Sequence, residues 1–249
     1  MGEATYDFTG RRVLVAGGTR GLGLSIARAF LRSGARVAIT GTHYLRSNYD
    51  ADLQPFEYAQ LDLTDHDAIN DLAQAVGQVD VLVNAAGLRL TKPHDASYRE
   101  FVSHATRIGL LGPAQLSSRL RSRLSESTMR GGGAVVNTQA LRRWFAYSHG
   151  PAVAHAEMLN HTAQLGGTWF RHGIRVNTVA AAVEVPRQSQ LRVQIDKNSG
   201  PLLTRPTGTR SGTLQDVAST ALFLASSSAA YVTGQTIIVN GGYGGARLG

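Results

Sequence analysis

Three glycines near the N-terminus have the spacing of a phosphate-binding loop. Gly17, Gly21 and Gly23 directly follow the apolar run 13–15 and precede a segment with the apolar periodicity of a helix. One glycine lets the chain reverse, one removes a Cβ where backbone must approach a pyrophosphate, and one lets the helix pack closely on the strand. The free N–H groups and positive dipole end of the helix then face the phosphates. The predicted nucleotide-binding residues of this loop are Gly17, Thr19, Arg20, Gly21, Leu22 and Gly23.

Strand-like and helix-like segments alternate along the 249 residues, and these elements must position the loop. The alternation predicts an α/β fold: a single doubly wound, Rossmann-like domain over residues 1–249, with a parallel sheet and helices on both faces. The predicted strands are 13–15, 36–40, 56–62, 79–84, 134–137, 175–179 and 237–239. The predicted helices are 23–32, 65–76, 101–124 and 151–170.

The composition limits the classes of function. The net charge is +8, carried almost wholly by arginine, and it indicates nucleic-acid affinity, an acidic substrate or simply the composition of a GC-rich bacterial genome. No nucleic-acid-binding motif accompanies the arginines, so we expect no nucleic-acid partner. Without cysteine there is no disulfide or thiol nucleophile, and we predict no metal site. No signal peptide or membrane-spanning run is evident, so we expect a cytoplasmic protein with no membrane partner.

Further motifs follow the glycine loop in order. They are Asp62-Leu63-Thr64, Asn84-Ala85-Ala86-Gly87, Gly173-Ile174-Arg175-Val176-Asn177, and Tyr231-Val232-Thr233-Gly234-Gln235 with Asn240-Gly241-Gly242. With these motifs the chain resembles the short-chain dehydrogenase/reductase family over nearly its whole length. The family opens with TGxxxGxG, and Ala16 replaces the threonine, which removes a structural hydroxyl.

The resemblance implies a nicotinamide cofactor. It adds to the predicted cofactor-binding residues Asp62, Leu63, Asn84, Ala85, Ala86 and Gly87. Members that prefer NAD carry an acidic residue at the end of the second strand, where this chain has Gly41. No carboxylate repels a 2′-phosphate there, and Arg20, Thr42 or His43 could contact it, so we predict NADPH. A solvated Arg20 and a surface His43 are the alternatives.

The resemblance also predicts that the usual proton-transfer groups are missing. Typical members use Asn, Ser, Tyr and Lys; tyrosine delivers the proton, and lysine holds the nicotinamide ribose and lowers the tyrosine pKa. Alignment with the family puts Ala140 at the serine, Pro151 at the tyrosine and His155 at the lysine. Gly109 falls within one residue of the asparagine. We therefore predict no catalytic residue of the usual kind, and His155 either keeps the ribose-positioning role or packs neutrally under the cofactor.

The substrate side is predicted from the same alignment. The predicted substrate-lining residues are Gln139, Ala140, Trp144, Tyr147 and Pro151. A substitute acid in the loop at Tyr147 is the alternative to simple cleft lining. The segment 182–212 has weak periodicity and scattered Pro, Gly and Arg, which suits either a mobile lid over the cleft or a passive surface insertion.

Three interpretations of function fit these residues. The first is an NADPH-dependent ketoreductase, because hydride transfer depends mainly on positioning the nicotinamide against a carbonyl. Among relatives without the usual residues, the chain resembles the angucyclinone ketoreductases of the simocyclinone type, which implies a polycyclic aromatic polyketide ketone, an antibiotic precursor, whose own phenol supplies the proton. The second is a catalytically silent NADP(H)-binding sensor or partner module. The third is a non-redox cyclase or dehydratase that reuses the cleft.

The family resemblance also implies a homo-oligomer, either a dimer or a tetramer. The helices at 112–124 and 151–170 would form its contact faces. Leu116, Leu120 and Leu124 are spaced four residues apart and offer an apolar stripe on the first of them. Burial of that stripe against the sheet would explain it equally well.

Overall fold

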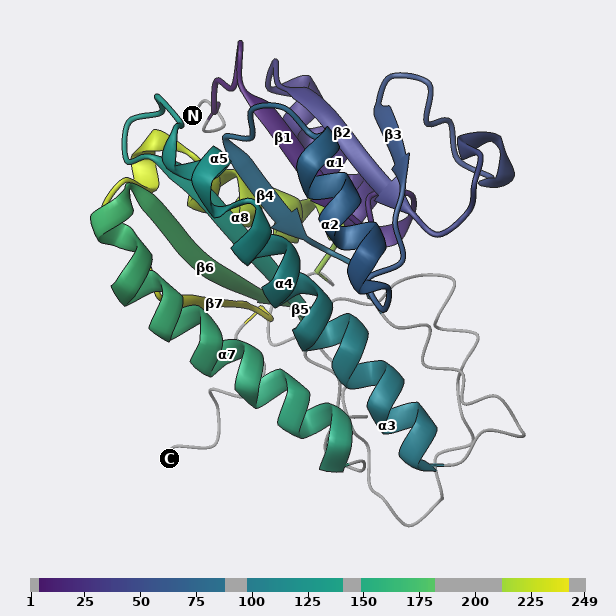
Figure 1. The fold of residues 1–249 in the computed structure, drawn as a ribbon. Coiled ribbons are helices and arrows are strands. Elements are labelled where there is room, and N and C mark those ends of the chain that lie inside the picture. The colour runs from purple at the N-terminus through teal and green to yellow at the C-terminus, as the bar shows by residue number, and fades with distance from the viewer. Residues whose placement is uncertain (1–4, 88–97, 141–148, 182–211, 242–249) are drawn as a thin grey trace.

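Seven parallel strands form one sheet in the order β3-β2-β1-β4-β5-β6-β7. The computed structural model describes residues 5–87, 98–140, 149–181 and 212–241 (Figure 1). The strands are β1 Arg12–Ala16, β2 Arg36–Gly41, β3 Glu57–Gln60, β4 Val81–Asn84, β5 Gly133–Ala140, β6 Ile174–Ala181 and β7 Thr236–Val239. The strand order reverses between β1 and β4, and ligands of open α/β sheets bind beyond the carboxyl ends of the strands at such a point.

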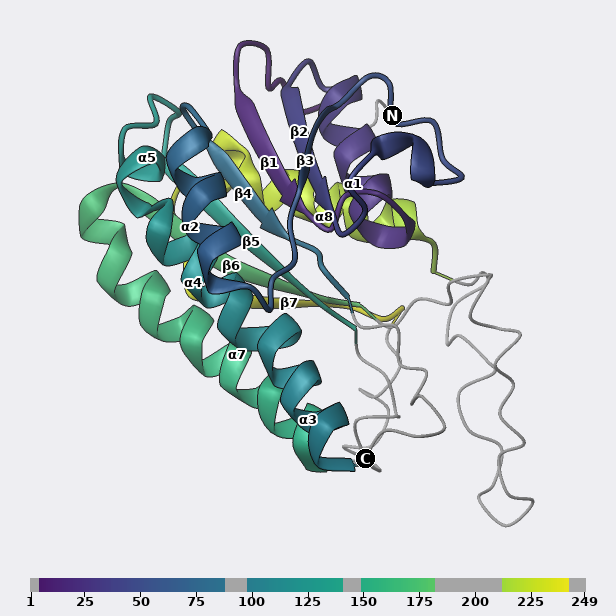
Figure 2. The same cartoon turned by 45° about the vertical axis from the view of Figure 1, so that its right-hand side comes forward.

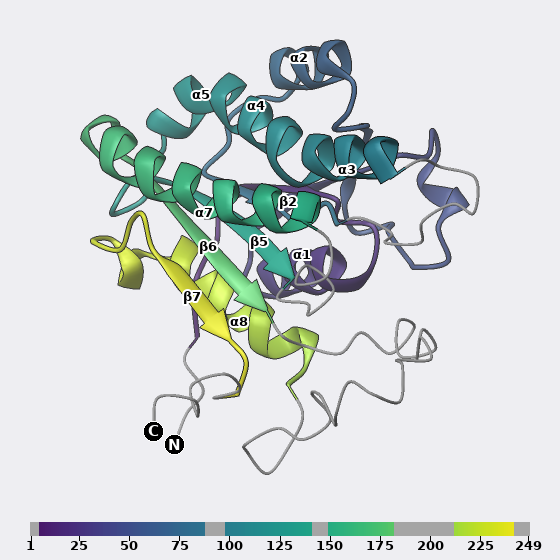
Figure 3. The same cartoon turned by 90° about the horizontal axis from the view of Figure 1, so that it is seen from below.

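Helices cover both faces of the sheet, as predicted. Figure 3 shows the three layers, with α1 Gly21–Arg32 and α8 Leu214–Ala225 beneath the sheet. The helices above the sheet are α2 His66–Ala75, α3 Tyr98–Thr106, α4 Gly112–Arg119, α5 Arg121–Ser125 and α7 His149–Trp169. Short 3-10 turns are η1 Arg46–Asn48, η3 Phe170–His172 and η5 Ser227–Ala229. The α/β class with a parallel sheet and two helical layers is therefore confirmed.

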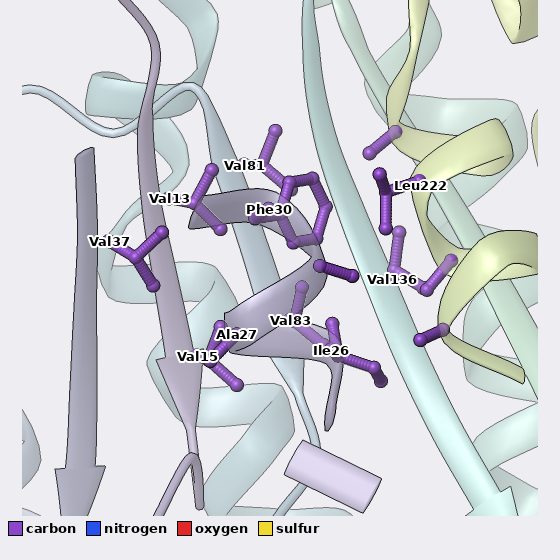
Figure 4. Close-up of a cluster of buried hydrophobic side chains, with 14 of the residues drawn as sticks. Val13, Val15, Ile26, Ala27, Phe30, Val37, Val81, Val83, Val136 and Leu222 are labelled. Carbon is purple, nitrogen blue, oxygen red and sulfur yellow. The ribbon is translucent and has the colours of Figure 1, made fainter. Parts of the chain in front are cut away.

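The core under α1 and α8 explains why the strands are apolar on both faces. Successive strand residues point to opposite faces, so Val13 and Val15 face α1 while Leu14 faces the other layer. Figure 4 shows Val13 and Val81 beside Phe30 of α1, Val15 beside Ala27, and Leu222 of α8 across from Phe30. Phe30 is fully buried, and a side chain of this kind contributes about 1.5–3 kcal/mol when it is removed from water. This layer holds the start of α1 against the end of β1.

The leucine stripe on the opposite face belongs to the core. Leu116, Leu120 and Leu124 are each 0% exposed and pack with Leu14 and Leu82 of the sheet. Of the two explanations for the stripe, burial against the sheet is the one that the structure supports. These leucines therefore do not form an oligomer face.

The predicted helix 101–124 is divided. After α3 the chain makes the π-helical segment η2 Arg107–Leu111, and then α4 and α5 follow. Pro113 at the start of α4 has no N–H to donate, so the regular helical hydrogen-bond pattern is interrupted there. Gly112 packs so tightly that a Cβ would lie 2.7 Å from Leu63 Cβ. The predicted helical region 101–124 is thus helical along nearly all its length, and this glycine–proline pair marks the boundary between η2 and α4.

Helix α8 was missed in the sequence, although it carries a start signal. Thr213 and Asp216 form a capping box: the Thr213 N–H donates to Asp216 Oδ2 at 2.7 Å, and the Asp216 N–H donates to Thr213 Oγ1 at 3.3 Å. An apolar run follows directly. The capping box marks the start of the helix directly after the segment 182–212, which has only weak apolar periodicity.

A buried arginine ties α8 to β6. Arg175 is 0% exposed and donates to carbonyl oxygens around the end of α8, among them Ala225 O at 3.0 Å and Ala229 O at 3.0 Å. Burial lowers the pKa of Arg175 to about 10, so the guanidinium stays charged at neutral pH. The C-terminal carbonyls of a helix carry partial negative charge and stabilise such a cation.

Candidate functional site

The glycine loop connects the end of β1 to the start of α1. A different structural reason excludes or disfavours a side chain at each of its three glycines. Gly17 has φ +80°, and a Cβ there would lie 2.6 Å from Ala86 Cα. A Cβ on Gly23 would overlap the Gly17 carbonyl oxygen. Gly21 has φ +53°, and nothing lies within 4 Å of the place where its Cβ would stand. The first two glycines are required by the packing, whereas the third opens onto space that a ligand can enter.

The N-terminus of α1 is left uncapped by side chains. Its N-cap residue, Arg20, makes no side-chain capping hydrogen bond, and no acidic residue occupies the first turn. In contrast, Asp65 caps α2 by accepting from the N–H groups of Asp67 at 2.9 Å and Ala68 at 3.1 Å. Helix α8 carries its own capping box. The first N–H groups of α1 therefore suit an external anion, and they fit the pyrophosphate of a dinucleotide.

Threonine 40 supports the loop from the neighbouring strand. The N–H of Gly17 donates to Thr40 Oγ1 at 3.2 Å, and the N–H of Gly18 donates to the Thr40 carbonyl oxygen at 3.1 Å. Thr40 is 2% exposed, so these hydrogen bonds are shielded from water. Ala85 fastens the other side through its N–H to the Ala16 carbonyl oxygen at 2.9 Å. The loop is thus held between β2 and the segment that follows β4.

The end of β2 is filled by a tyrosine hydroxyl that the sequence analysis did not single out. A Cβ on Gly41 would lie 2.6 Å from Thr19 Cγ2 and 2.9 Å from Tyr49 Cζ, and closer still to the Tyr49 hydroxyl oxygen. The backbone N–H of His43 donates to this hydroxyl at 2.9 Å. The hydroxyl of Tyr58 donates to the His43 carbonyl oxygen. Aromatic hydroxyls after a second strand were the available signal, but nothing in the sequence placed them beside Gly41.

The two tyrosines titrate differently. Burial pushes the pKa of Tyr49 upward, but hydrogen bonds from the His43 backbone and from the hydroxyls of Tyr58, Thr42 and Thr19 outweigh it, and the pKa falls below its ordinary value. Burial raises the pKa of Tyr58 well above its ordinary value, and the neighbouring Tyr49 adds to the rise. The pKa values of the two phenols are therefore shifted in opposite directions, and the Tyr49 hydroxyl is the more acidic of the two.

The predicted cofactor residues that follow β3 and β4 are partly exposed and partly buried. Asp62 is exposed, and its Oδ1 accepts from the N–H and the hydroxyl of Thr64, each at 2.8 Å. Leu63 is 7% exposed and belongs to the core. Ala85 and Ala86 are half-buried beside the loop, whereas Gly87 is exposed. Asp62 and Gly87 are therefore open to a ligand, and Leu63 supports them from below.

Asn84 begins a chain of buried side-chain hydrogen bonds across the sheet. Its Nδ2 donates to Ser117 Oγ at 3.1 Å and to Asn137 Oδ1 at 2.8 Å. Asn137 Nδ2 donates to Thr162 Oγ1 at 3.0 Å, and the hydroxyls of Thr162 and Thr178 lie 2.8 Å apart. All five residues are less than 5% exposed. This chain, the buried polar frame, joins β4, β5, β6, α4 and α7 beneath the carboxyl edge of the sheet.

The positions aligned with the family's proton-transfer residues lie around that edge. Ala140 ends β5 and pairs with Ala181 of β6, while Pro151 and His155 lie one helical turn apart near the start of α7. Gly109 lies in η2, where a Cβ would meet nothing within 4 Å. Figure 2 shows α3 and α7 side by side beyond the strand ends. Trp144, Tyr147 and the segment 182–211 lie outside the described residues.

Comparison with known proteins identifies the family. The family model described as enoyl-(acyl carrier protein) reductase matches residues 16–244, which is most of the chain. The chain belongs to the short-chain dehydrogenase/reductase family. Within the part of the chain that the structure describes, no helix has the length and apolar character needed to cross a membrane.

Individual relatives cover nearly the whole short-chain dehydrogenase/reductase chain. Gluconate 5-dehydrogenase of Gluconobacter oxydans is 26% identical, over 95% of this chain and 96% of its own. The 3-oxoacyl-(acyl-carrier-protein) reductase FabG of Salmonella typhimurium is 29% identical, over 95% and 98%. A solved gluconate 5-dehydrogenase from Burkholderia cenocepacia, in complex with NADP and tartrate, superimposes with a TM-score of 0.77 at 26% identity, over 95% and 96%. These relatives are oxidoreductases that act on different substrates.

Proposed function

We propose that this protein is an NADPH-dependent ketoreductase that reduces a ketone on a polycyclic aromatic polyketide, with a phenol of the substrate as the proton source. The observation that carries the proposal is the uncapped N-terminus of α1 behind a glycine loop that leaves space at Gly21. Packing alone requires Gly17 and Gly23, but Gly21 has φ +53° and no atom within 4 Å of its Cβ position, so the backbone at the start of α1 is open to a phosphate. The absence of the usual acid at Ala140 and Pro151 supports the proton source.

The choice of NADPH is supported from two sides. The solved gluconate 5-dehydrogenase relative is in complex with NADP. In this chain the end of β2 presents Gly41 and the hydroxyl of Tyr49, with no carboxylate to repel a 2′-phosphate. Arg20, at the N-cap of α1, brings a guanidinium to the same loop.

The reaction balances without a protein acid. NADPH, when bound, supplies a hydride. Reduction breaks the π bond of the ketone, forms a C–H bond with that hydride and forms an O–H bond with the proton of a phenol that is hydrogen-bonded to the carbonyl. The phenolate recovers a proton from water. The protein contributes positioning, which alone can lower a barrier by about 7–11 kcal/mol when the reacting atoms are well aligned.

The chain's own residues supply that positioning. The loop from Gly17 to Gly23 holds the dinucleotide against α1, while the buried polar frame keeps the ends of β4, β5 and β6 in register. Ala140 and Ala181 pair at the adjacent ends of β5 and β6, and both residues are small. His155 stands where the family's lysine holds the nicotinamide ribose, and we assign it that positioning role.

A methylated substrate analogue tests the proton source. We expect the purified protein to oxidise NADPH with a hydroxylated polycyclic ketone, and to reduce the analogue whose neighbouring phenol is methylated at least about 100-fold more slowly, the lower end of what a positioned proton donor contributes. The rate should fall as pH rises through the pKa of the substrate phenol. Equal rates with both ketones would contradict the substrate-derived proton.

The second candidate is a silent NADP(H)-binding module, and one observation favours it. Neither Ala140 nor Pro151 has a side chain that can donate a proton. Tight NADPH binding with no turnover on any ketone of the panel would support this candidate, whereas failure to bind NADPH would support the non-redox alternative.

A further inference from the structure

Residue 41, at the position that contacts the adenosine ribose in dinucleotide-binding folds, is a glycine and has no side chain. In dinucleotide-binding folds the residue at the end of the second strand contacts the ribose 2′ position, about 20 residues after the glycine motif. Here that residue is Gly41, which is buried at the end of β2. Its missing Cβ could not be added, because Thr19 Cγ2 and Tyr49 Cζ would lie 2.6 Å and 2.9 Å away. A side chain from eight residues further along the chain fills the space.

The hydroxyl of Tyr49 is held at this place from two directions. The His43 N–H donates to it at 2.9 Å, and the His43 and Tyr49 rings lie 4.7 Å apart. The Tyr58 ring lies 6.1 Å from Tyr49 on the other side. A phenol has one donor and two acceptor positions. The Tyr49 hydroxyl accepts from the His43 N–H and also has the hydroxyls of Thr19, Thr42 and Tyr58 as hydrogen-bond neighbours, and a charged phosphate is a stronger acceptor for its proton than any of these neutral hydroxyls.

Unlike Tyr49, Tyr58 uses its hydroxyl proton in hydrogen bonds to the backbone. Its hydroxyl donates to the Gly41 carbonyl oxygen at 3.3 Å and to the His43 carbonyl oxygen. Both acceptors belong to the backbone that leaves β2, so Tyr58 holds this turn in place. Tyr58 is therefore a positioning residue, and Tyr49 presents the neutral donor.

We propose that Tyr49 selects NADPH: its hydroxyl occupies the space that the side chain of an NAD-selective residue 41 would enter, and it donates to the 2′-phosphate. This inference rests on the proposed function, because it requires the nucleotide to lie along the glycine loop. A hydrogen bond to a charged phosphate is stronger than one to a neutral ribose hydroxyl. Replacing a carboxylate by a neutral donor also removes the repulsion that excludes a 2′-phosphate.

Binding of nucleotide fragments tests the inference without catalysis. Titration calorimetry of the full chain would use adenosine 2′,5′-bisphosphate and AMP, which differ only in the 2′-phosphate. We expect Tyr49→Phe to lower the affinity for the bisphosphate by about tenfold or more and to leave AMP binding unchanged, since one charge-assisted hydrogen bond is lost. Tyr44→Phe is the matched control, because Tyr44 lies in the same turn and is 78% exposed. It should change neither affinity.

A second variant keeps the phenol but moves it. Gly41→Ala places a Cβ against the Tyr49 hydroxyl and should produce the same selective loss for the bisphosphate, which covers the case in which Tyr49→Phe does not fold. An equal loss for both fragments, or no loss for either, would overturn the role of Tyr49 while the nucleotide site stands. If the unaltered protein binds neither fragment, the proposed function fails and this inference fails with it.

Discussion

The carboxyl ends of β1 and β5 lie on the same edge of one sheet, but they differ in the groups that they offer. The end of β1 offers backbone suited to a phosphate, whereas the end of β5 offers no proton-donating side chain at Ala140. At the end of β1 the packing excludes side chains at Gly17 and Gly23, and α1 begins without a side-chain cap. At the end of β5 the backbone is in register with β6 through Ala140 and Ala181, yet Ala140 offers no proton. Beneath both ends, the buried polar frame is intact.

The difference separates holding a cofactor from supplying a proton. Binding a pyrophosphate needs backbone N–H groups and close approach, which only the local geometry of the loop provides. Delivering a proton needs one side chain of suitable pKa, and a substrate that carries its own phenol can replace it. The frame joins the strands on which both ends depend, so we expect it to act on stability and not on either step directly.

The largest effect is expected at the cofactor end. In Gly23→Ala the new Cβ overlaps the Gly17 carbonyl oxygen, so the loop and the first turn of α1 must separate. We expect the affinity for NADPH to fall about 100-fold, because two hydrogen bonds to charged phosphate, each worth about 1.5–3 kcal/mol, are displaced. Fluorescence titration measures this. Gly167→Ala is the control, because Gly167 is exposed in α7 with nothing near its Cβ position. Similar losses of NADPH affinity in both variants would contradict a specific role of the loop in holding the cofactor.

An intermediate effect is expected in the frame. Thr162→Val keeps the shape of the side chain but leaves Asn137 Nδ2 and Thr178 Oγ1 without their partner. Unsatisfied buried groups of this kind cost about 1–3 kcal/mol, so the melting temperature should fall by roughly 2–12 °C. Thermal unfolding measures the change, and NADPH affinity of the folded protein should stay within about twofold. Thr168→Val, on the exposed side of α7, should leave stability within about 0.5 kcal/mol. A large loss of NADPH affinity in Thr162→Val would show that the frame and the loop are not separable.

The smallest effect is expected from restoring the usual residues. The triple variant Ala140→Ser, Pro151→Tyr, His155→Lys should change the rate on the phenolic ketone by less than about threefold, because the substrate already supplies the proton. Initial rates of NADPH oxidation measure this. A gain of about 100-fold, the scale of general acid catalysis, would show that the end of β5 limits the reaction for want of an acid.

Local patterns predicted most of the fold and the cofactor loop. The order of strands and helices follows from runs of apolar residues, and the glycine spacing identified the turn into α1 because φ above zero and close approach are properties of single residues. The helical region 101–124 was also predicted, but the place where it divides depends on how Gly112 packs on Leu63, which no local pattern specifies. Helix α8 was missed although the capping box at Thr213 was readable.

The sequence by itself therefore determined the class of fold and the place of the glycine loop, since each depends on residue type and near neighbours. That Ala140 and Pro151 stand at the positions of the usual acid stays a prediction from the alignment. Only the tertiary structure decided what stands at Gly41 and how Asn84 is used. The Tyr49 hydroxyl reaches Gly41 through a turn that Tyr58 holds from another strand. The hydrogen bond from Asn84 to Asn137 joins residues 53 apart. Such contacts arise when separate strands pack into one sheet, and no local pattern along the chain specifies them.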